Sequence, residues 1–330
     1  YNLALISGNA AATVSGNASN LGAVTLQNAT AAGTVSFNGI FEAAAITTFG
    51  GPHDISFTGD ATTVTNAVTF NNTGNLILGD NAADVCTFNG GVTHTAGDTT
   101  LSGRLQTSDD AITLDNLTLG STSIIRSLDA AAGAVIAING NVTGAGYNLA
   151  LISGNAAATV SGNATGLGAV TLQNATAAGT VSFNGIFEAA AITTFGGPHD
   201  ISFTGDATTV TNAVTFNNTG NLILGDNAAD VCTFNGGVTH TAGDTTLSGR
   251  LQTSDDAITL DNLTLGSTSI IRSLDAAAGA VIAINGNVTG AGYNLALISG
   301  NAAATVSGNA SNLGAVTLQN ATAAGTVSFN

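Results

Sequence analysis

Short stretches in which apolar and polar residues alternate recur along the whole chain. One set is evenly spaced and begins at positions 23, 45 and 67: AVTLQN (23–28), AITTFG (45–50) and AVTFNN (67–72). A second set lies between its members: TVSFNG (34–39), DISFTG (54–59) and NLILGD (75–80). Alternation with a period of two is typical of β-strands, whose successive side chains point to opposite faces. The pattern therefore predicts many short strands, and the regular steps within each set predict a longer period that joins two or three strands into one turn.

Helices are scarce in this pattern. Each strand-like stretch ends in Asn, Gly or Asp, the residues that best tolerate the left-handed backbone of tight corners. The Ala-rich pieces FEAAA (41–45) and LDAAAG (128–133) are each about one helical turn long, which is too short for a stable isolated helix. We expect both pieces to be small residues packed at corners, with Asp129 able to cap a single turn.

A much longer repeat overlies the strand pattern. The segment YNLALISGNAAATVSGNA occurs three times, at 1–18, 147–164 and 293–310. The chain therefore divides into repeat unit 1 (1–146), repeat unit 2 (147–292) and the start of repeat unit 3 (293–330), a window that we expect to belong to a longer array with capping segments. The first two units differ only where Ser19 and Asn20 become Thr165 and Gly166.

These two periods predict an all-β fold, a parallel β-solenoid with about seven turns of about 21 residues in each repeat unit. Like residues should stack on like in successive turns and form two buried columns: Val24, Ile46 and Val68 in one, and Val35, Ile55 and Leu76 in the other. Phe37, Phe57 and Phe70 should fill the interior. Corner residues such as Asn28 and Asn72 could form hydrogen-bonded ladders. The competing architecture is a string of immunoglobulin-type sandwiches, which often carry a core Trp and a tyrosine corner. The chain has no Trp, and its one Tyr per unit stands at the repeat start.

Composition narrows the range of partners. Only 7% of residues are charged, the four basic residues are all Arg, and the net charge is −16. Nucleic acids and anionic membranes attract basic surfaces, so we expect neither as a partner, and no segment looks able to insert into a membrane. The 44% of apolar residues is enough to form a core. Each full unit holds one cysteine, Cys86 or Cys232, which we interpret as a small buried hydrophobe.

The runs of xVTLxN and xVSFNG, the Asn and Gly corners, the absence of Lys and the near-identical tandem units resemble the repeats of bacterial surface exoproteins. This group includes giant adhesins, autotransporter passengers and filamentous-haemagglutinin-like proteins. The resemblance covers the whole chain, and it is one of composition and periodicity. It implies a right-handed parallel β-helix exported to the cell surface, and it carries over no catalytic residue.

Three groups of polar residues could indicate a site. His53 and Asp54 are adjacent in GPHD, but catalysis depends on spatial arrangement and not on adjacency, so we expect a solvated turn histidine. His94 is expected to point outward among threonines. Asp80 with Asp84, or Asp109 with Asp110, could bind a calcium ion weakly at a corner. The simpler interpretation is that these are solvated turn carboxylates.

Other functions fit the sequence less well. A catalytic cleft is not usually built from identical tandem units, and ice binding would need a T-x-T motif at every turn, whereas Thr63-Val64-Thr65 recurs only sporadically. We expect no enzyme activity, no catalytic or metal-binding residue and no cofactor. The sequence favours a structural segment of an extracellular or cell-surface fibre, whose partner is the same chain in continuation or in lateral assembly. The alternative is an adhesin shaft that binds glycans or a partner surface, with Tyr1 and Phe41 as candidate exposed aromatics.

Overall fold

The computed structural model describes residues 1–28, 33–127, 135–154, 156–173, 179–273, 280–300, 302–319 and 325–330. These residues form β-strands and turns, and no helix occurs among them. The chain forms two compact units, one of Tyr1–Gly168 with Gln173–Gly179 and one of Ala169–Leu172 with Thr180–Asn330. The boundaries of these compact units differ from those of the sequence repeat.

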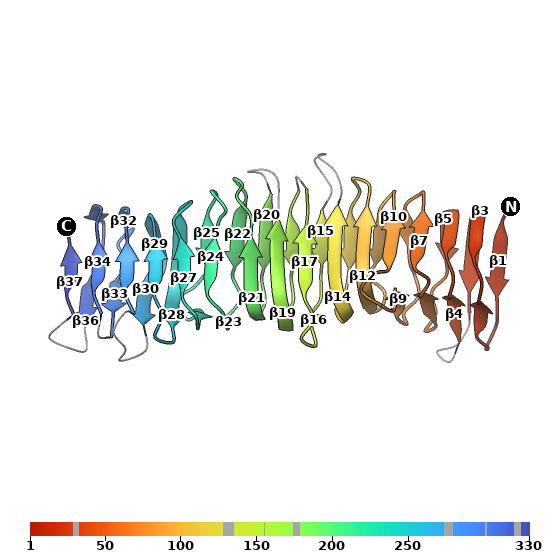
Figure 1. Ribbon diagram of the computed structural model, residues 1–330, viewed down its shortest axis with the longest axis horizontal. Helices are drawn as coiled ribbons and strands as arrows, with labels where there is room; N and C mark the ends of the chain where they lie inside the picture. The colour runs from red at the N-terminus through yellow and green to blue at the C-terminus, as the bar shows by residue number, and fades with distance from the viewer. Residues whose placement is uncertain are drawn as a thin grey trace. The chain divides into compact units, whose positions relative to one another are not determined.

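Within each unit the strands stand side by side, each turn next to the turns before and after it (Figure 1). The strands of the first unit are β1 (Leu3–Ile6), β2 (Ala12–Val14), β3 (Ala18–Gln27), β4 (Thr34–Phe37), β5 (Phe41–Thr48), β6 (Asp54–Phe57), β7 (Ala61–Val64), β8 (Val68–Thr69), β9 (Leu76–Leu78), β10 (Val85–Phe88), β11 (Val92–His94), β12 (Thr99–Thr107), β13 (Ile112–Leu114), β14 (Leu117–Ser127), β15 (Ile136–Ile138), β16 (Val142–Thr143), β17 (Leu149–Ile152) and β18 (Ala158–Val160). Strand β19 (Ala164–Gln173) has residues in both units.

The second unit repeats this order of strands. They are β20 (Thr180–Phe183), β21 (Phe187–Thr194), β22 (Asp200–Phe203), β23 (Ala207–Val210), β24 (Val214–Phe216), β25 (Leu222–Leu224), β26 (Val231–Phe234), β27 (Val238–His240), β28 (Thr245–Thr253), β29 (Ile258–Leu260), β30 (Leu263–Ser273), β31 (Ile282–Ile284), β32 (Val288–Thr289), β33 (Leu295–Ile298), β34 (Ala304–Val306), β35 (Ala310–Ser311), β36 (Val316–Gln319) and β37 (Val327–Phe329).

The strands pair in parallel with the turns above and below, which makes each unit a β-solenoid and confirms the predicted fold class. Val24, for example, pairs with Ile46 of the next turn. Individual turns differ in length: the step from Val85 to Arg104 is short, and the step from Ile124 to Ala150 is long. The hydrogen bonds from His94 to Asn72 and from Asn163 to Asn141 each join successive turns across 22 residues, close to the predicted length of a turn.

The strands form columns, with one strand from each turn. The column that begins with β2 continues through β4, β6, β9, the first halves of β12 and β14, and β16. A second column, called here the β3 column, begins at Ala18 of β3 and continues through the start of β5, β7, β10, the second halves of β12 and β14, and β17.

Turns and sequence copies are out of step. Seven turns after Ala12, the β2 column reaches Ala164 of β19, which is the copy of Ala18 in β3 and not the copy of Ala12 in β2. The β3 column likewise reaches β17, the copy of β1. A third column runs through β8, β11, β13, β15 and β18, so each turn crosses three columns. Because each copy in the next repeat lies one column short of seven full turns, a repeat contains about six and two-thirds turns. A strand and its copy in the next repeat therefore lie in different columns.

The predicted core columns are present. Val35 stacks on Ile55, and Ile55 on Leu76, and all three are fully buried. Phe37 and Phe57 fill the interior, with ring centroids 5.4 Å apart and ring planes 6° from parallel. Complete burial of such a side chain contributes about 1.5–3 kcal/mol, so the repeated columns are the main source of stability.

The prediction that FEAAA (41–45) packs as a corner is wrong, because these residues begin strand β5. Phe41 and Ala43 point inward and are buried, whereas Glu42 and Ala44 are exposed. The alternation of inward and outward positions outweighs the helical preference of alanine, because stacking on β3 and β7 buries the inward side chains. The second Ala-rich piece (128–133), with Asp129, lies outside the described residues.

Asparagines of the corners bond to neighbouring turns, as predicted; the side-chain amide of Asn28, for example, donates to the hydroxyl of Ser7, 21 residues earlier, at 2.6 Å. The side-chain oxygen of Asn116 accepts a hydrogen bond from the backbone N–H of Asn141, 2.8 Å away. Asn141 in turn accepts one from the backbone N–H of Asn163, also at 2.8 Å. Asn72 instead donates to the carbonyl groups of its own corner and of His53. The ladders tie successive corners together.

Candidate functional site

The expectation of a solvated His53 is wrong, because its side chain is completely buried. Neither ring nitrogen has a hydrogen-bond partner among the described residues. Burial lowers the pKa of His53, since desolvation penalises the charged imidazolium, and the charge of Asp54 only partly opposes this effect. Asp54 itself accepts a hydrogen bond from the backbone N–H of Asn75 at 2.7 Å. His53 and Asp54 therefore do not act as a dyad, and His199 repeats the arrangement with Asp200.

His94 is also buried and does not point outward as expected. Its Nδ1 lies 2.9 Å from the hydroxyl of Thr99, and its Nε2 lies 3.2 Å from the carbonyl oxygen of Asn72. Burial lowers the pKa of His94, although the hydrogen bond to Asn72 opposes the shift. The ring also packs edge-on against Phe70, at a centroid distance of 6.3 Å. His94 is thus a buried, hydrogen-bonded side chain of the core.

The acidic corner GDNAAD (79–84) is built around a buried carboxylate, not a solvated one. One oxygen of Asp84 accepts hydrogen bonds from the backbone N–H groups of Asp80 and Asn81, at 2.8 and 3.2 Å. The other accepts one from the side-chain amide of Asn81, at 2.8 Å. Three donors already satisfy this carboxylate. It closes the loop by accepting from N–H groups three and four residues earlier in the chain.

Cys86 and Cys232 are free and buried, which confirms the interpretation of small buried hydrophobes. Burial raises the pKa of each thiol to about 12. Because the thiolate is the reactive species, neither cysteine is activated as a nucleophile at neutral pH.

All four arginines of the chain lie on the outer side of strands β12, β14, β28 and β30. In the first unit, Arg104 pairs with Ile124 and Gln106 pairs with Arg126, so the two cations lie diagonally across adjacent turns. Neither forms an ion pair with a carboxylate in the described part of the chain. Sequence reasoning missed this grouping, because it depends on the register between turns.

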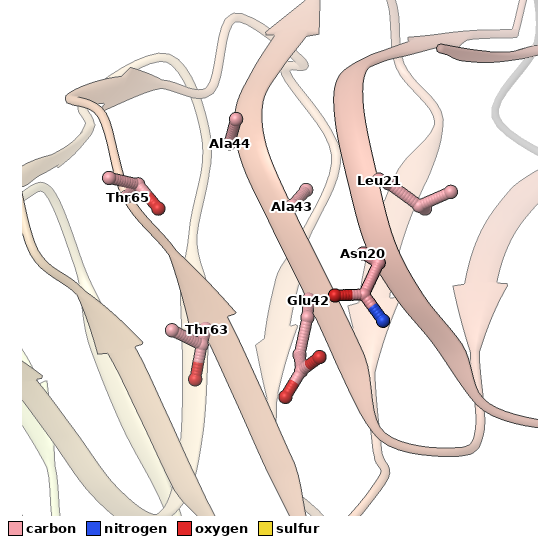
Figure 2. Close-up of a pocket in the computed structure, with 7 residues that line it drawn as sticks. All are labelled: Asn20, Leu21, Glu42, Ala43, Ala44, Thr63 and Thr65. Atoms are coloured by element: carbon pink, nitrogen blue, oxygen red, sulfur yellow. The ribbon is translucent and has the colours of Figure 1, made fainter. Parts of the chain in front are cut away.

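A shallow hollow of about 310 Å³ lies on the outside of β3, β5 and β7 (Figure 2). Asn20, Glu42 and Thr63 come from three successive strands around it, and Glu42 supplies its only carboxylate. Leu21 forms part of its apolar lining. The copy of Leu21, Leu167, is only 4% exposed because the chain around Gly144, in the preceding turn, covers it. A preceding turn therefore covers the apolar part of such a hollow.

The exposed aromatic residues differ in part from those expected. Tyr1 is fully exposed, as expected, but Phe41 is buried between Phe37 and Phe57. The other exposed aromatic side chains among the described residues are Phe49 and Tyr147, their copies Phe195 and Tyr293, and Phe329 in the last described strand. The first four are between 40% and 45% exposed, so one Phe and one Tyr recur on the surface.

No group of three or more His, Cys, Asp or Glu side chains suited to a metal ion occurs among the described residues. In the same part of the chain, no helix is long and apolar enough to cross a membrane. What remains on the surface is a set of low-charge β-faces with isolated carboxylates at corners and paired arginines in one column.

Comparison with known proteins finds no matching family model, no similar curated protein and no similar solved structure.

Proposed function

We propose that this chain is a structural segment of an extracellular or cell-surface fibre or stalk. In this role the chain is a passive scaffold and not an enzyme. Its principal partner is the continuation of the same chain, and nucleic acid is not a partner. We also propose that it needs no cofactor, since protein N–H groups already satisfy the most buried carboxylate, Asp84.

The observation that carries this proposal is the unbroken parallel pairing of turns within each unit. Each turn buries its apolar side chains only against its neighbours, so stability accumulates with the number of turns. The near-identity of the repeats means that adding or losing one repeat recreates the same contacts. A chain of this kind sets a length and resists extension, which are the properties of a spacer.

Support for the surface location comes from the resemblance to bacterial adhesin, autotransporter-passenger and filamentous-haemagglutinin-like repeats. The low charge and the absence of Lys fit that group, and the β-solenoid fold is the one that the resemblance implies. This argument is one of likeness in composition, period and fold.

The alternative is an adhesin shaft whose surface binds glycans or a partner. The recurrence of the exposed Phe49 and Tyr147 in each repeat favours it, because sugar rings stack on exposed aromatic faces. A glycan-array screen of the chain tests this alternative. Binding that is lost in the variant Phe49→Ser with Phe195→Ser would support the adhesin shaft.

The scaffold proposal is tested by deleting one sequence repeat (147–292) in the producing cells and labelling intact cells with antibodies to the repeat. We expect surface labelling, and a fibre shortened by roughly 32 Å, from six and two-thirds turns at the usual strand spacing. Label confined to the cell interior, or an unchanged fibre length, would refute the scaffold proposal.

A further inference from the structure

One outer face of each unit carries few charged side chains, and its acidic and basic residues stand at fixed positions relative to each other. In the first unit this face is formed by the outward side chains of the β3 column. One row across it runs through residues that pair in register from turn to turn: Glu42, Thr63, Thr87, Gln106, Arg126 and Ile152. We call this row the charged row.

The charged row holds one residue of each sign, Glu42 and Arg126. Glu42 is exposed, and Arg126 lies four turns further along, at a distance of about 19 Å for the usual strand spacing. Thr87 is two turns from each, and therefore marks the midpoint. A two-fold axis that lies parallel to the face, midway between two facing copies, and crosses the row at right angles over Thr87 would place Glu42 of one copy opposite Arg126 of the other.

The cations on this face, Arg126 and the neighbouring Arg104, form no ion pair with any carboxylate of the described residues, although the chain carries 20 carboxylates. The Nε of Arg104 is also buried without a hydrogen-bond partner. Arg104 is flanked by Val85 and Ile124, so the arginines project from an aliphatic surface that association would cover.

The second unit has the same row in the same register. Glu188 pairs with Thr209, and the row continues through Thr233 and Gln252 to Arg272. Glu188 is exposed, as Glu42 is. The arrangement is therefore a property of the repeat and not of one end of the chain.

We infer that this face is a lateral contact between two copies of the chain, packed antiparallel about a two-fold axis over Thr87 or its copy Thr233. Such an isologous contact uses the same patch on both partners, so each Glu42–Arg126 pairing occurs twice. Sheets packed face to face lie about 10 Å apart, a gap that a glutamate and an arginine together span. The fork of the guanidinium suits bidentate pairing with a carboxylate.

Charge complementarity favours a second copy over an anionic polysaccharide. The charged row contains both signs at matched positions, whereas a polyanion would be repelled by Glu42 and by the net charge of −16. None of the outward residues of the row is aromatic, so the face lacks the stacking surface typical of a sugar site. This inference rests on the proposed scaffold function, to which it adds a lateral partner, a second copy of the same chain.

Reciprocal charge swaps in the full chain test the pairing. One variant carries Glu42→Arg with Glu188→Arg, and the other carries Arg126→Glu with Arg272→Glu. Each variant alone places like charges opposite each other, so its dimer dissociation constant should rise by about tenfold or more relative to the unaltered chain. An equimolar mixture should recover dimers, because every contact between the two variants is again complementary. Sedimentation equilibrium measures all of these states, and circular dichroism verifies that each variant folds.

A charge-matched control separates the contact from the net charge. Arg126→Gln with Arg272→Gln makes the chain more negative by two charges, and so does Thr118→Glu with Thr264→Glu on exposed positions outside the charged row. Only the arginine variant should weaken the dimer. Equal effects of the two variants, or an unaltered chain that stays monomeric at every accessible concentration, would overturn the pairing and leave the axial scaffold function intact.

Cross-linking locates the two-fold axis. A bis-maleimide cross-linker with a span of about 8–10 Å should join the variant Thr87→Cys with Thr233→Cys into a dimer, because facing backbones about 10 Å apart are too distant for a direct disulfide. The same reagent should not join Thr118→Cys with Thr264→Cys. The native Cys86 and Cys232 are buried and do not interfere. Equal cross-linking of both variants would contradict the geometry. Arginine-dependent binding of polygalacturonate by a chain that remains monomeric would show that the face is a glycan site instead.

Discussion

At the scale of single residues, backbone conformation explains the more informative of the two differences between the repeats. Asn20 has a φ of 56°, its copy Gly166 has 64°, and the third copy Asn312 has 53°. This left-handed region is accessible to glycine without cost and to asparagine more readily than to other residues. The exchange of Asn for Gly therefore preserves the corner. The exchange of Ser19 for Thr165 has no comparable explanation in the structure.

Ala145 and Ala291 occupy the same left-handed region, with φ values of 49° and 50°. A side chain with a Cβ is strained there by about 1–2 kcal/mol. Substituting both with glycine should raise the free energy of unfolding, by about 1 kcal/mol at each site after the entropy cost of glycine is counted. Urea denaturation measures the change. Glycine at the exposed Ala67 and Ala213, which have ordinary φ values, should lower stability; a gain there would contradict this reasoning.

The buried histidines make stability depend on pH. The pKa of His53 and of His94 is lowered in the folded chain, so the unfolded chain binds more protons in acid. Their contribution is complete above the unfolded pKa near 6.5 and is lost as the pH falls through and below it. We expect the urea midpoint to fall between about pH 7.5 and about pH 5.5.

A histidine variant tests whether these side chains cause the pH effect. His53→Leu with His199→Leu removes two buried imidazoles that have no hydrogen-bond partner among the described residues, so it should reduce the loss in acid with little cost at neutral pH. An undiminished pH dependence in this variant would assign the effect to other groups.

Alternation predicted the inward residues well, and its failures have identifiable causes. His94 stands two positions after the buried Val92 in GVTHTAG, so the alternation itself indicates an inward side chain. The expectation that His94 points outward did not follow this alternation. His53 follows a Gly-Gly-Pro corner, where period two no longer applies. The grouping of the arginines with Glu42 depends on turns of unequal length, which a single sequence does not reveal.

At the scale of elements, stacked corners constrain the chain as strongly as the strands do. Gly39 and Gly59 lie at equivalent corners of successive turns, and a Cβ on Gly59 would collide with the backbone of Gly39. Only glycine allows this approach, although Gly59 has an ordinary φ. The corner sequences FNG and FTG therefore carry steric as well as conformational information.

The variant Gly59→Ala should lower the free energy of unfolding by about 1–3 kcal/mol, because the backbone of the preceding corner must move. Gly50 offers a matched control, since a Cβ there meets only the carbonyl oxygen of Asn71, at an ordinary contact distance of 3.7 Å, and its φ is ordinary. Gly50→Ala should leave stability unchanged or slightly raised. Equal effects of the two substitutions in urea denaturation would show that the corners are not closely stacked.

At the scale of the whole molecule, the number of turns in a repeat decides how surface features are presented. Since a repeat contains about six and two-thirds turns, a strand and its copy occupy different columns within one unit. The sequence suggested about seven turns, and from its periods alone the fraction was not visible, because the step from turn to turn varies. This arrangement does not align repeated ligand-binding residues in one column, because each copy lies in a different column. A scaffold does not need such an alignment.

The most direct test of the scaffold account is cryo-electron microscopy of the native fibre, read for its axial spacing. We predict a continuous layer spacing of about 4.8 Å, the distance between paired strands, along the whole length of the fibre. Separate beads without this fine spacing would mean independent sandwich domains on a string, and would contradict the β-solenoid scaffold.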